Sequence, residues 1–220
     1  MKKDLALRPI DFTSSFLSCE KDLESILRRL FIESQPYSDE LKKLLVINTK
    51  DCLDNKTSEV YKNAIKDMSL AKLREMGYIK FEPKVKMAEH EEIKSYLIFS
   101  FDNFISNQSN PEFRDCNVYI DILCHTDCWD LGNFRIRPLK IAGYIDGILN
   151  KARLSGIGTF QFAGCNELVL DETLSGYTLS YSAIHGTDDS LPSSHDWIQK
   201  WILMIYFYYQ GTIFLFLRLA

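Results

Sequence analysis

The stretch that decides the fold is FRDCNVYIDILCHTDCWDLGNFRIRPLKIAGYIDGILNKARL, from Phe113 to Leu154. Between Cys116 and Cys124, apolar and polar residues alternate, as in a strand with one face in the core. A polar loop follows. Isoleucines then recur at the three- and four-residue spacing of one helix face, joined by Leu149 and Ala152. The stretch therefore predicts a strand, a loop and an amphipathic helix at the centre of the fold.

Proline and glycine mark the ends of this helix. Pro138 suits its first turn, where a missing N–H leaves no helical hydrogen bond unmade. Ser155-Gly156 and Gly158 predict where the helix stops. Gly143 and Gly147 lie inside it, where each lowers helicity by up to ~1 kcal/mol. We expect both internal glycines to pack closely against a sheet or a neighbouring helix.

Helical periodicity also dominates the first third of the chain. Apolar spacing predicts the helices Glu20–Glu33 and Asp39–Val46, with Ser38 as the N-cap of the second. A third apolar stripe is formed by Val60, Tyr61, Ala64, Ile65 and Met68. Ser69 is expected to cap one or two further turns, and Gly77 to end them.

After these helices the period changes to that of strands. Pro83 confines the segment Tyr78–Met87 to an edge strand or an extended arm. Ile93–Phe101 has apolar residues on both faces, which predicts a strand covered on both sides at its centre. Asn103–Arg114 is a loop by composition. Turn residues favour antiparallel pairing of the remaining predicted strands, Thr159–Phe162, Glu167–Leu170 and Gly176–Ile184.

This order of elements predicts an α+β fold, with N-terminal helices followed by a mainly antiparallel sheet packed against one long helix. The chain divides by composition into a helical region 1–77, an α+β domain 78–186, a linker 187–196 and an apolar C-terminal segment 197–220. Asp188 and Asp189 lie in the linker with too few acids around them for a calcium loop. We expect that pair to be solvated.

Composition places the chain of 220 residues among ordinary globular proteins, since 46% are hydrophobic and 25% charged. A formal charge of -4 and scattered basic residues argue against a nucleic-acid surface, which needs clustered lysine and arginine. The N-terminal residues carry charges and Pro9 in place of the apolar core of a signal peptide. The six cysteines are too sparse for a disulfide scaffold, so we expect reduced thiols in a cytosol.

The C-terminal segment has a different character. Trp201–Leu217 runs for 17 residues without a charge, at the short end of a membrane span. Trp197, Lys200 and Arg218 flank it as interfacial anchors would. Tyrosines and polar residues occupy its centre, however, where a span rarely has them. Three interpretations stay open: a membrane anchor, an element that docks on the domain or a partner, and a tail foreign to the native fold.

Thiols and an imidazole raise the hypothesis of a metal site. Cys116, Cys124, His125 and Cys128 fall within thirteen residues, and zinc prefers four ligands of these types. On a strand, however, Cys116 and Cys124 would lie some ~26 Å apart from end to end. We therefore expect buried cysteines and a loop histidine, and we predict neither a metal site nor a cofactor.

Catalytic motifs are not evident in the sequence. Cys128 lies near His125, but the carboxylates of Asp127 and Asp130 would raise the pKa of its thiol and disfavour the thiolate. The glycines match no phosphate-binding loop. His90 stands among glutamates without the spacing of a zinc-protease motif. We expect no catalytic residues and no enzymatic activity.

The order of elements in the second half resembles the tail-terminator and head–tail joining proteins of tailed bacteriophages. An alternating strand (Asn117–Cys124), a loop, the helix Arg135–Leu154 and a strand pair ending in Tyr177–Ile184 carry this resemblance, over about Ile93–His185. Members of that family are small α+β subunits that form rings, commonly hexamers, and they have no enzymatic activity. The resemblance implies a structural virion protein, assembled in the host cytoplasm, whose partners are its own copies and neighbouring neck or tail-tube proteins.

A ring subunit needs arms or strand edges that bridge to its neighbours. The Pro83 arm and the loops Asn103–Arg114 and Thr126–Asn133 are candidates. We expect an interface around the last of these, because Trp and Arg dominate interaction hot spots. Its predicted residues are Asp127, Trp129, Asp130, Arg135 and Arg137.

The alternative hypothesis is a domain held at the cytoplasmic side of a membrane. In that case Trp201–Leu217 would be the anchor and the only membrane contact.

Overall fold

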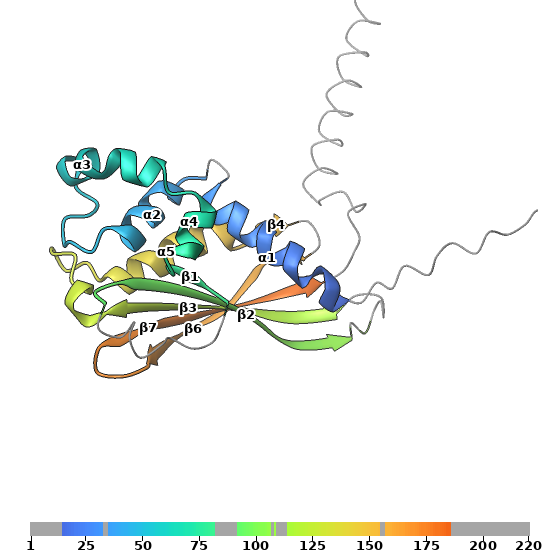
Figure 1. Ribbon diagram of the computed structural model, residues 1–220. Helices are drawn as coiled ribbons and strands as arrows, with labels where there is room; N and C mark the ends of the chain where they lie inside the picture. Colours follow the sequence, from blue (N-terminus) through green and yellow to red (C-terminus); the bar gives the residue numbers. More distant parts are fainter. Residues whose placement is uncertain are drawn as a thin grey trace, which may run out of the picture. The chain divides into compact units, whose positions relative to one another are not determined.

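The computed structural model describes residues 15–32, 35–81, 92–106, 108, 114–154 and 157–185. Within them, five strands form one sheet in the order β1-β2-β3-β7-β6 (Figure 1). The strands are β1 (Ile79–Lys80), β2 (Ser95–Ser106), β3 (Arg114–His125), β6 (Gln161–Val169) and β7 (Leu174–His185). β1 runs parallel to β2, and the other neighbouring pairs are antiparallel. Two short strands, β4 (Arg153–Leu154) and β5 (Gly158–Thr159), pair with each other.

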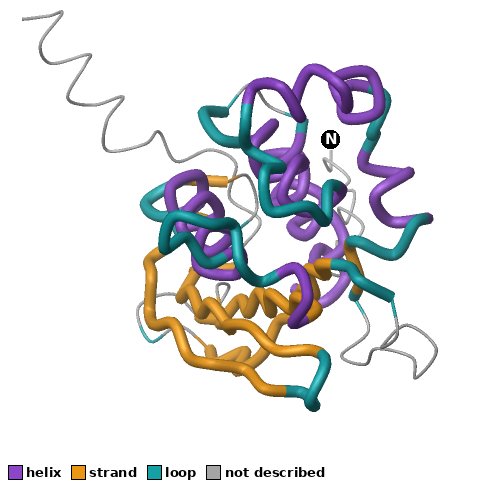
Figure 2. Tube along the Cα trace, turned by 90° about the vertical axis from the view of Figure 1, so that its left-hand side faces the viewer, coloured by secondary structure: helices purple, strands orange, loops and turns teal. Residues whose placement is uncertain are grey.

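The helices of the described chain gather on one face of the sheet (Figures 1 and 2). They are α1 (Ser15–Phe31), α2 (Ser38–Val46), α3 (Asn55–Lys66), α4 (Leu70–Glu75) and α5 (Arg137–Leu149), and a 3-10 turn, η2, spans Thr126–Cys128. The predicted α+β fold, with N-terminal helices and a mainly antiparallel sheet, is confirmed, but α5 is not alone against the sheet, since α1 and α2 share its core.

The sheet face beneath the helices carries the core. β3 alternates as predicted, with Val118, Ile120 and Ile122 fully buried between half-buried polar residues. Ile141 and Ile145 of α5 belong to the same cluster, as do buried residues of α1 and α2. A fully buried side chain of this size contributes about 1.5–3 kcal/mol. The N-terminal helices and the sheet therefore share one hydrophobic core.

The other face of the sheet is apolar only near one end. Tyr96, Ile98, Leu123 and Leu174 form a small second cluster there. Because Leu97 and Phe99 belong to the main core, β2 is buried on both sides at this point, as predicted. Farther along, this face is polar, and the Thr178 hydroxyl donates to Asp121 Oδ1 at 2.6 Å.

Gly176 is required where β7 passes β3. A Cβ atom at this position would lie 1.8 Å from the carbonyl oxygen of Ile122. Any larger residue must therefore displace the backbone of one of the two strands. The sequence pattern predicts a strand here but not this close approach.

Two predicted helix ends are confirmed and two are wrong. The Ser69 hydroxyl accepts from Lys72 N–H, and Gly77 adopts a left-handed φ of 77°. Ser38, in contrast, is the first residue of α2, its hydroxyl is buried without a hydrogen bond, and Tyr37 is the N-cap at φ 78°. The first helix covers Ser15–Phe31 instead of Glu20–Glu33.

The strands are longer than the apolar pattern predicts. β2 continues to Ser106 and β3 begins at Arg114, so much of the expected loop Asn103–Arg114 is strand. Backbone pairing resumes after a register shift between Asp102 and Ile105, which apolar spacing cannot show. The two predicted strands Thr159–Phe162 and Glu167–Leu170 are largely joined in β6, again through a register shift.

The long helix ends earlier than predicted. α5 stops at Leu149, and Arg153–Leu154 already form β4, so Ser155-Gly156 and Gly158 do not terminate it. Gly143 is open, with nothing within 4 Å of a Cβ atom built there. Gly147 meets only the ring of Tyr37, at an ordinary 3.6 Å, so the prediction of close glycine packing is wrong.

The third predicted apolar stripe is only half buried. Ile65 and Met68 belong to the core, whereas Val60 is 80% exposed and Tyr61 and Ala64 also face solvent. α3 packs mainly against α2, and much of this side of the helix faces solvent.

Several predictions fall on residues outside the described ranges. They concern Pro83, His90, the linker with Asp188 and Asp189, and Trp201–Leu217. Among the residues that are described, no helix is both long and apolar enough to cross a membrane.

Candidate functional site

A short loop between β3 and α5 collects most of the residues predicted for the interface. We call residues 129–136 the Phe134 loop. Asp130 and Ile136 form an isolated antiparallel bridge across it. Inside that bridge, Leu131 N–H donates to Arg135 O and Arg135 N–H donates to Gly132 O, each at 3.0 Å. The loop is therefore a small hydrogen-bonded hairpin.

The tip of the loop has an unusual backbone. Gly132, Asn133 and Phe134 all have positive φ, at 72°, 51° and 60°. Glycine and asparagine tolerate this left-handed region, but a bulky residue there costs about 1–3 kcal/mol. Phe134 is also fully exposed, at 107% of the reference area, so burial within its own chain does not offset that cost. The hydrogen bonds of the hairpin hold an aromatic ring in solvent.

Arg137 anchors the C-terminal end of this loop. Its guanidinium donates from Nε to Cys128 O at 2.6 Å and from Nη1 to Leu44 O and Ile47 O at 2.6 and 2.8 Å. Nη2 donates to Thr49 O at 2.8 Å. The last carbonyls of α2 lack helical partners and carry the negative end of its dipole, so a buried cation is stabilised there.

This placement corrects one predicted site residue. Arg137 was expected at a contact surface, but its side chain is completely buried. All four of the bonds above end on backbone carbonyls, and through them the guanidinium joins α5 to the η2 turn and to the end of α2. Arg137 is a structural residue, and another protein cannot reach it in this fold.

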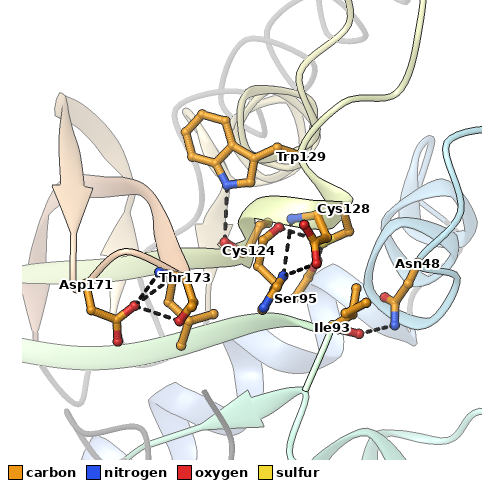
Figure 3. A network of polar contacts seen from close by, with 11 residues as sticks. Asn48, Ile93, Ser95, Cys124, Cys128, Trp129, Asp171 and Thr173 are labelled. Atoms are coloured by element: carbon orange, nitrogen blue, oxygen red, sulfur yellow. Dashed lines mark hydrogen bonds and ion pairs between the residues drawn. The ribbon is translucent and has the colours of Figure 1, made fainter. Parts of the chain in front are cut away.

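Trp129 is half-buried at the start of the loop. Its indole N–H donates to Cys124 O at 3.1 Å, and its ring packs against the main core (Figure 3). Figure 3 also shows Asn48 reaching Ile93 O and Asp171 accepting from Thr173 nearby. The tryptophan therefore fixes the loop to the end of β3.

The charged residues of the loop are placed differently from one another. Asp130 is exposed, pairs with Lys50 Nζ at 2.8 Å and accepts from Gly132 N–H at 2.7 Å. Both contacts lower the pKa of the Asp130 carboxyl group, and the contact with Lys50 has the larger effect. Arg135 donates to Gly132 O and Leu131 O, both at 3.3 Å, and so supports the tip. Asp127 is exposed outside the loop, 3.6 Å from His125 Nδ1.

The thiols near the loop are poorly suited to nucleophilic chemistry. Burial raises the pKa of Cys128, and the nearby Arg137 guanidinium opposes this only in part. From the sequence, Asp127 and Asp130 were expected to raise the pKa of Cys128, but in the structure its largest cause is burial of the thiol. Cys128 donates to His125 O at 3.2 Å and approaches Ser95 Oγ at 3.8 Å. Burial also raises the pKa of Cys124, to about 12.

The cysteines of β3 do not come together. Cys116 and Cys124 lie near opposite ends of the strand and are free thiols. Within the described residues, no group of three His, Cys, Asp or Glu side chains could hold a metal ion.

Phe134 is the residue that sequence reasoning missed. A Gly-Asn pair is a strong turn signal, and here it directly precedes the aromatic residue. That signal places Phe134 at the end of a tight turn, where a side chain is usually exposed. Ile136 and Leu139, close by in the sequence, are exposed as well.

Comparison with protein families gives one match. The model of the YomW family matches residues 38–183, from the first residue of α2 nearly to the end of β7. The chain belongs to the YomW family. The matched region includes the Phe134 loop, Arg137 and the carbonyls that its guanidinium binds. We call Arg137 and these carbonyl acceptors the Arg137 clamp. The name has the form of a phage gene name, which is consistent with a phage protein and says nothing of a tail terminator. Comparisons with curated proteins and with solved structures found no match.

Proposed function

We propose that this chain is a non-enzymatic structural subunit of a bacteriophage neck or tail, of the tail-terminator or head–tail joining type, that assembles into a ring. The family name and the order of elements support a phage protein. The observation that carries the proposal is the Phe134 loop, which presents a fully exposed aromatic side chain on a hydrogen-bonded turn.

The energetics of this loop favour a protein partner. Burying a phenylalanine side chain contributes about 1.5–3 kcal/mol, and aromatic residues are common among interaction hot spots. Because the turn is already held by its own hydrogen bonds, little ordering entropy is lost on binding. We assign this loop to the contact with a neighbouring neck or tail protein.

The polar groups around the loop support a role in assembly over a role in catalysis. Arg137 and Arg135 donate to backbone carbonyls, and Asp130 is paired with Lys50. Burial raises the pKa of the Cys128 thiol. These groups are engaged in holding the loop, which leaves Phe134 as its feature directed outward.

The test uses the purified full-length chain and phage particles from a lysate of the strain that encodes it. Phe134→Ser should weaken binding to the particles by about tenfold or more, the effect of losing ~1.4 kcal/mol or more of contact energy. Leu139→Ser is the matched control, because Leu139 is an exposed apolar residue on α5. It should change binding by less than about threefold. A wild-type chain that stays monomeric at high concentration and binds no phage particle would contradict the proposal.

A further inference from the structure

We propose that the ring closes by strand pairing between copies, with β6 of one subunit adding to the outer edge of β2 of the next. This inference rests on the proposed ring. It concerns contacts between identical subunits, whereas the Phe134 loop is assigned to a different protein. Four observations carry it: two open edges, their directions, the faces of their side chains and the residue types at the edges.

The first open edge is that of β6. Leu170 N–H donates to Leu174 O at 3.0 Å, so the alternation of an antiparallel ladder turns the backbone of every second residue toward β7. Cys165, Glu167 and Val169 consequently direct their N–H and C=O groups away from β7. Within the described chain, these groups meet no hydrogen-bonding partner, and the first bond at this edge is that of Phe162 N–H to Asn150 Oδ1.

The second open edge is that of β2. β1 pairs with it only at Leu97 and Ile98, where Leu97 N–H donates to Tyr78 O at 2.8 Å. By the same alternation, Phe99 and Phe101 also direct their backbone groups outward, beyond the end of β1. Within the described residues, β1 therefore leaves the outward backbone groups of Phe99 and Phe101 unpaired at the outer edge of β2.

The directions of the two edges are compatible. β2, β3, β7 and β6 are antiparallel in succession, so β2 and β6 run in opposite directions. A second copy placed beside the first in the same orientation brings its β2 antiparallel to β6. The contact joins two different surfaces, so it does not give a two-fold dimer, and it gives a ring where the rotation between copies closes, as the proposed ring requires.

The side-chain faces agree as well. Residues opposite each other on antiparallel strands share a face of the sheet. Cys165 lies opposite the core residue Leu179. Burial and, to a lesser degree, the Asp146 carboxylate of α5 raise the pKa of its thiol, so Cys165 is on the helix side. Phe99 and Phe101 also pack into the main core on that side. Pairing the outward residues therefore keeps the helices of both copies on one face of a continuous sheet.

The residue types at the two edges also permit pairing. Neither free edge contains a lysine or proline, the residues that usually prevent edge pairing.

Glu167→Pro in the full-length chain tests this contact. Proline removes an N–H that β7 does not use, so the intramolecular ladder is kept while an intermolecular bond is lost. Glu167→Thr is the control, because it removes the same charge and keeps the N–H. Sedimentation should show a ring for the wild type and for Glu167→Thr, and a shift of the Glu167→Pro chain toward monomer by about tenfold or more in apparent dissociation constant.

The outcomes separate this inference from the proposed function. A ring that is unaffected by Glu167→Pro would overturn strand pairing at β6 and leave the ring itself standing. A wild-type chain that is monomeric at all concentrations would overturn both. If Glu167→Pro fails to fold, hydrogen exchange of the wild type decides: the amides of Cys165, Glu167 and Val169 should be protected in the assembled form and exchange quickly in the dilute monomer. Equal, fast exchange in both forms would overturn the inference.

Discussion

Arg137 and Phe134 lie on the same short connection, yet the arginine is completely buried and the phenylalanine is fully exposed. This is the reverse of what residue type alone suggests. The arginine is stabilised inside by backbone carbonyls at the end of α2, while the aromatic ring is held outside by a hydrogen-bonded turn.

The difference teaches how this connection is built. One end is fixed in the core, and the other end displays an apolar group at a defined place. A loop fixed in this way loses little freedom when a partner binds it. The following predictions test whether burial at Arg137 and exposure at Phe134 are separable properties, in order of decreasing effect on stability.

Arg137→Leu should have the largest effect. The substitution leaves carbonyls of residues 44, 47, 49 and 128 without their donor in a buried site, which should lower the free energy of unfolding by about 3–5 kcal/mol. Chemical denaturation measures it. Arg135→Leu is the control, because Arg135 donates only within the loop, and it should cost less than about 1 kcal/mol. Equal losses for the two variants would show that the clamp is not specific to Arg137.

Phe134→Gly should have a small effect of opposite sign. Glycine adopts the left-handed φ of 60° without the about 1–2 kcal/mol that a side chain costs there, although it gives the unfolded chain more freedom. The net change should be a gain of up to about 1 kcal/mol in the free energy of unfolding. Phe134→Ala keeps the Cβ atom and should show no such gain. A clear loss of stability in Phe134→Gly would mean that the ring contributes to the fold.

Acid should reveal the smallest effect, at Asp130. Its pKa is lowered in the folded state by Lys50 and by Gly132 N–H, so the ionised form stabilises the fold at pH values above the ordinary carboxyl pKa of ~3.9. That contribution is lost as the pH falls through the lower, folded-state pKa. The difference in Tm between the wild type and Asp130→Asn should therefore be present at neutral pH and disappear in strong acid. A difference that grows on acidification would contradict this linkage.

The sequence predicts the centre of the fold well and its extent less well. The alternation in β3 and the helical spacing of α5 follow directly from burial on one face, so both elements and their buried apolar faces are confirmed. β2 continues to Ser106 because its backbone pairs with β3 beyond the last core residue. Backbone pairing of this kind requires no apolar side chains, so it cannot be read from the sequence. For this reason a loop was predicted at Asn103–Arg114, where β2 continues to Ser106 and β3 begins at Arg114.

The candidate site shows where sequence reasoning stops. Trp129, Asp130 and Arg135 are brought together in one loop, as the spacing indicates, and their role as an interface stays a prediction. The burial of Arg137 could not be read from its neighbours in sequence, because three of the four carbonyls that bind it lie at or just after the end of α2. The exposure of Phe134 depends on backbone angles, which only the preceding Gly-Asn pair indicates.

The hydrogen bonds of Arg137 also bear on when the Phe134 loop becomes anchored during synthesis of the chain. Its acceptors at Thr49, Ile47 and Leu44 are made 88, 90 and 93 residues before the guanidinium arrives from the ribosome. Until then the end of α2 has no such donor, and the Phe134 loop, which directly precedes Arg137, is not anchored to it. The Phe134 side chain is therefore fixed to α2 only on a chain whose early and late segments have already joined.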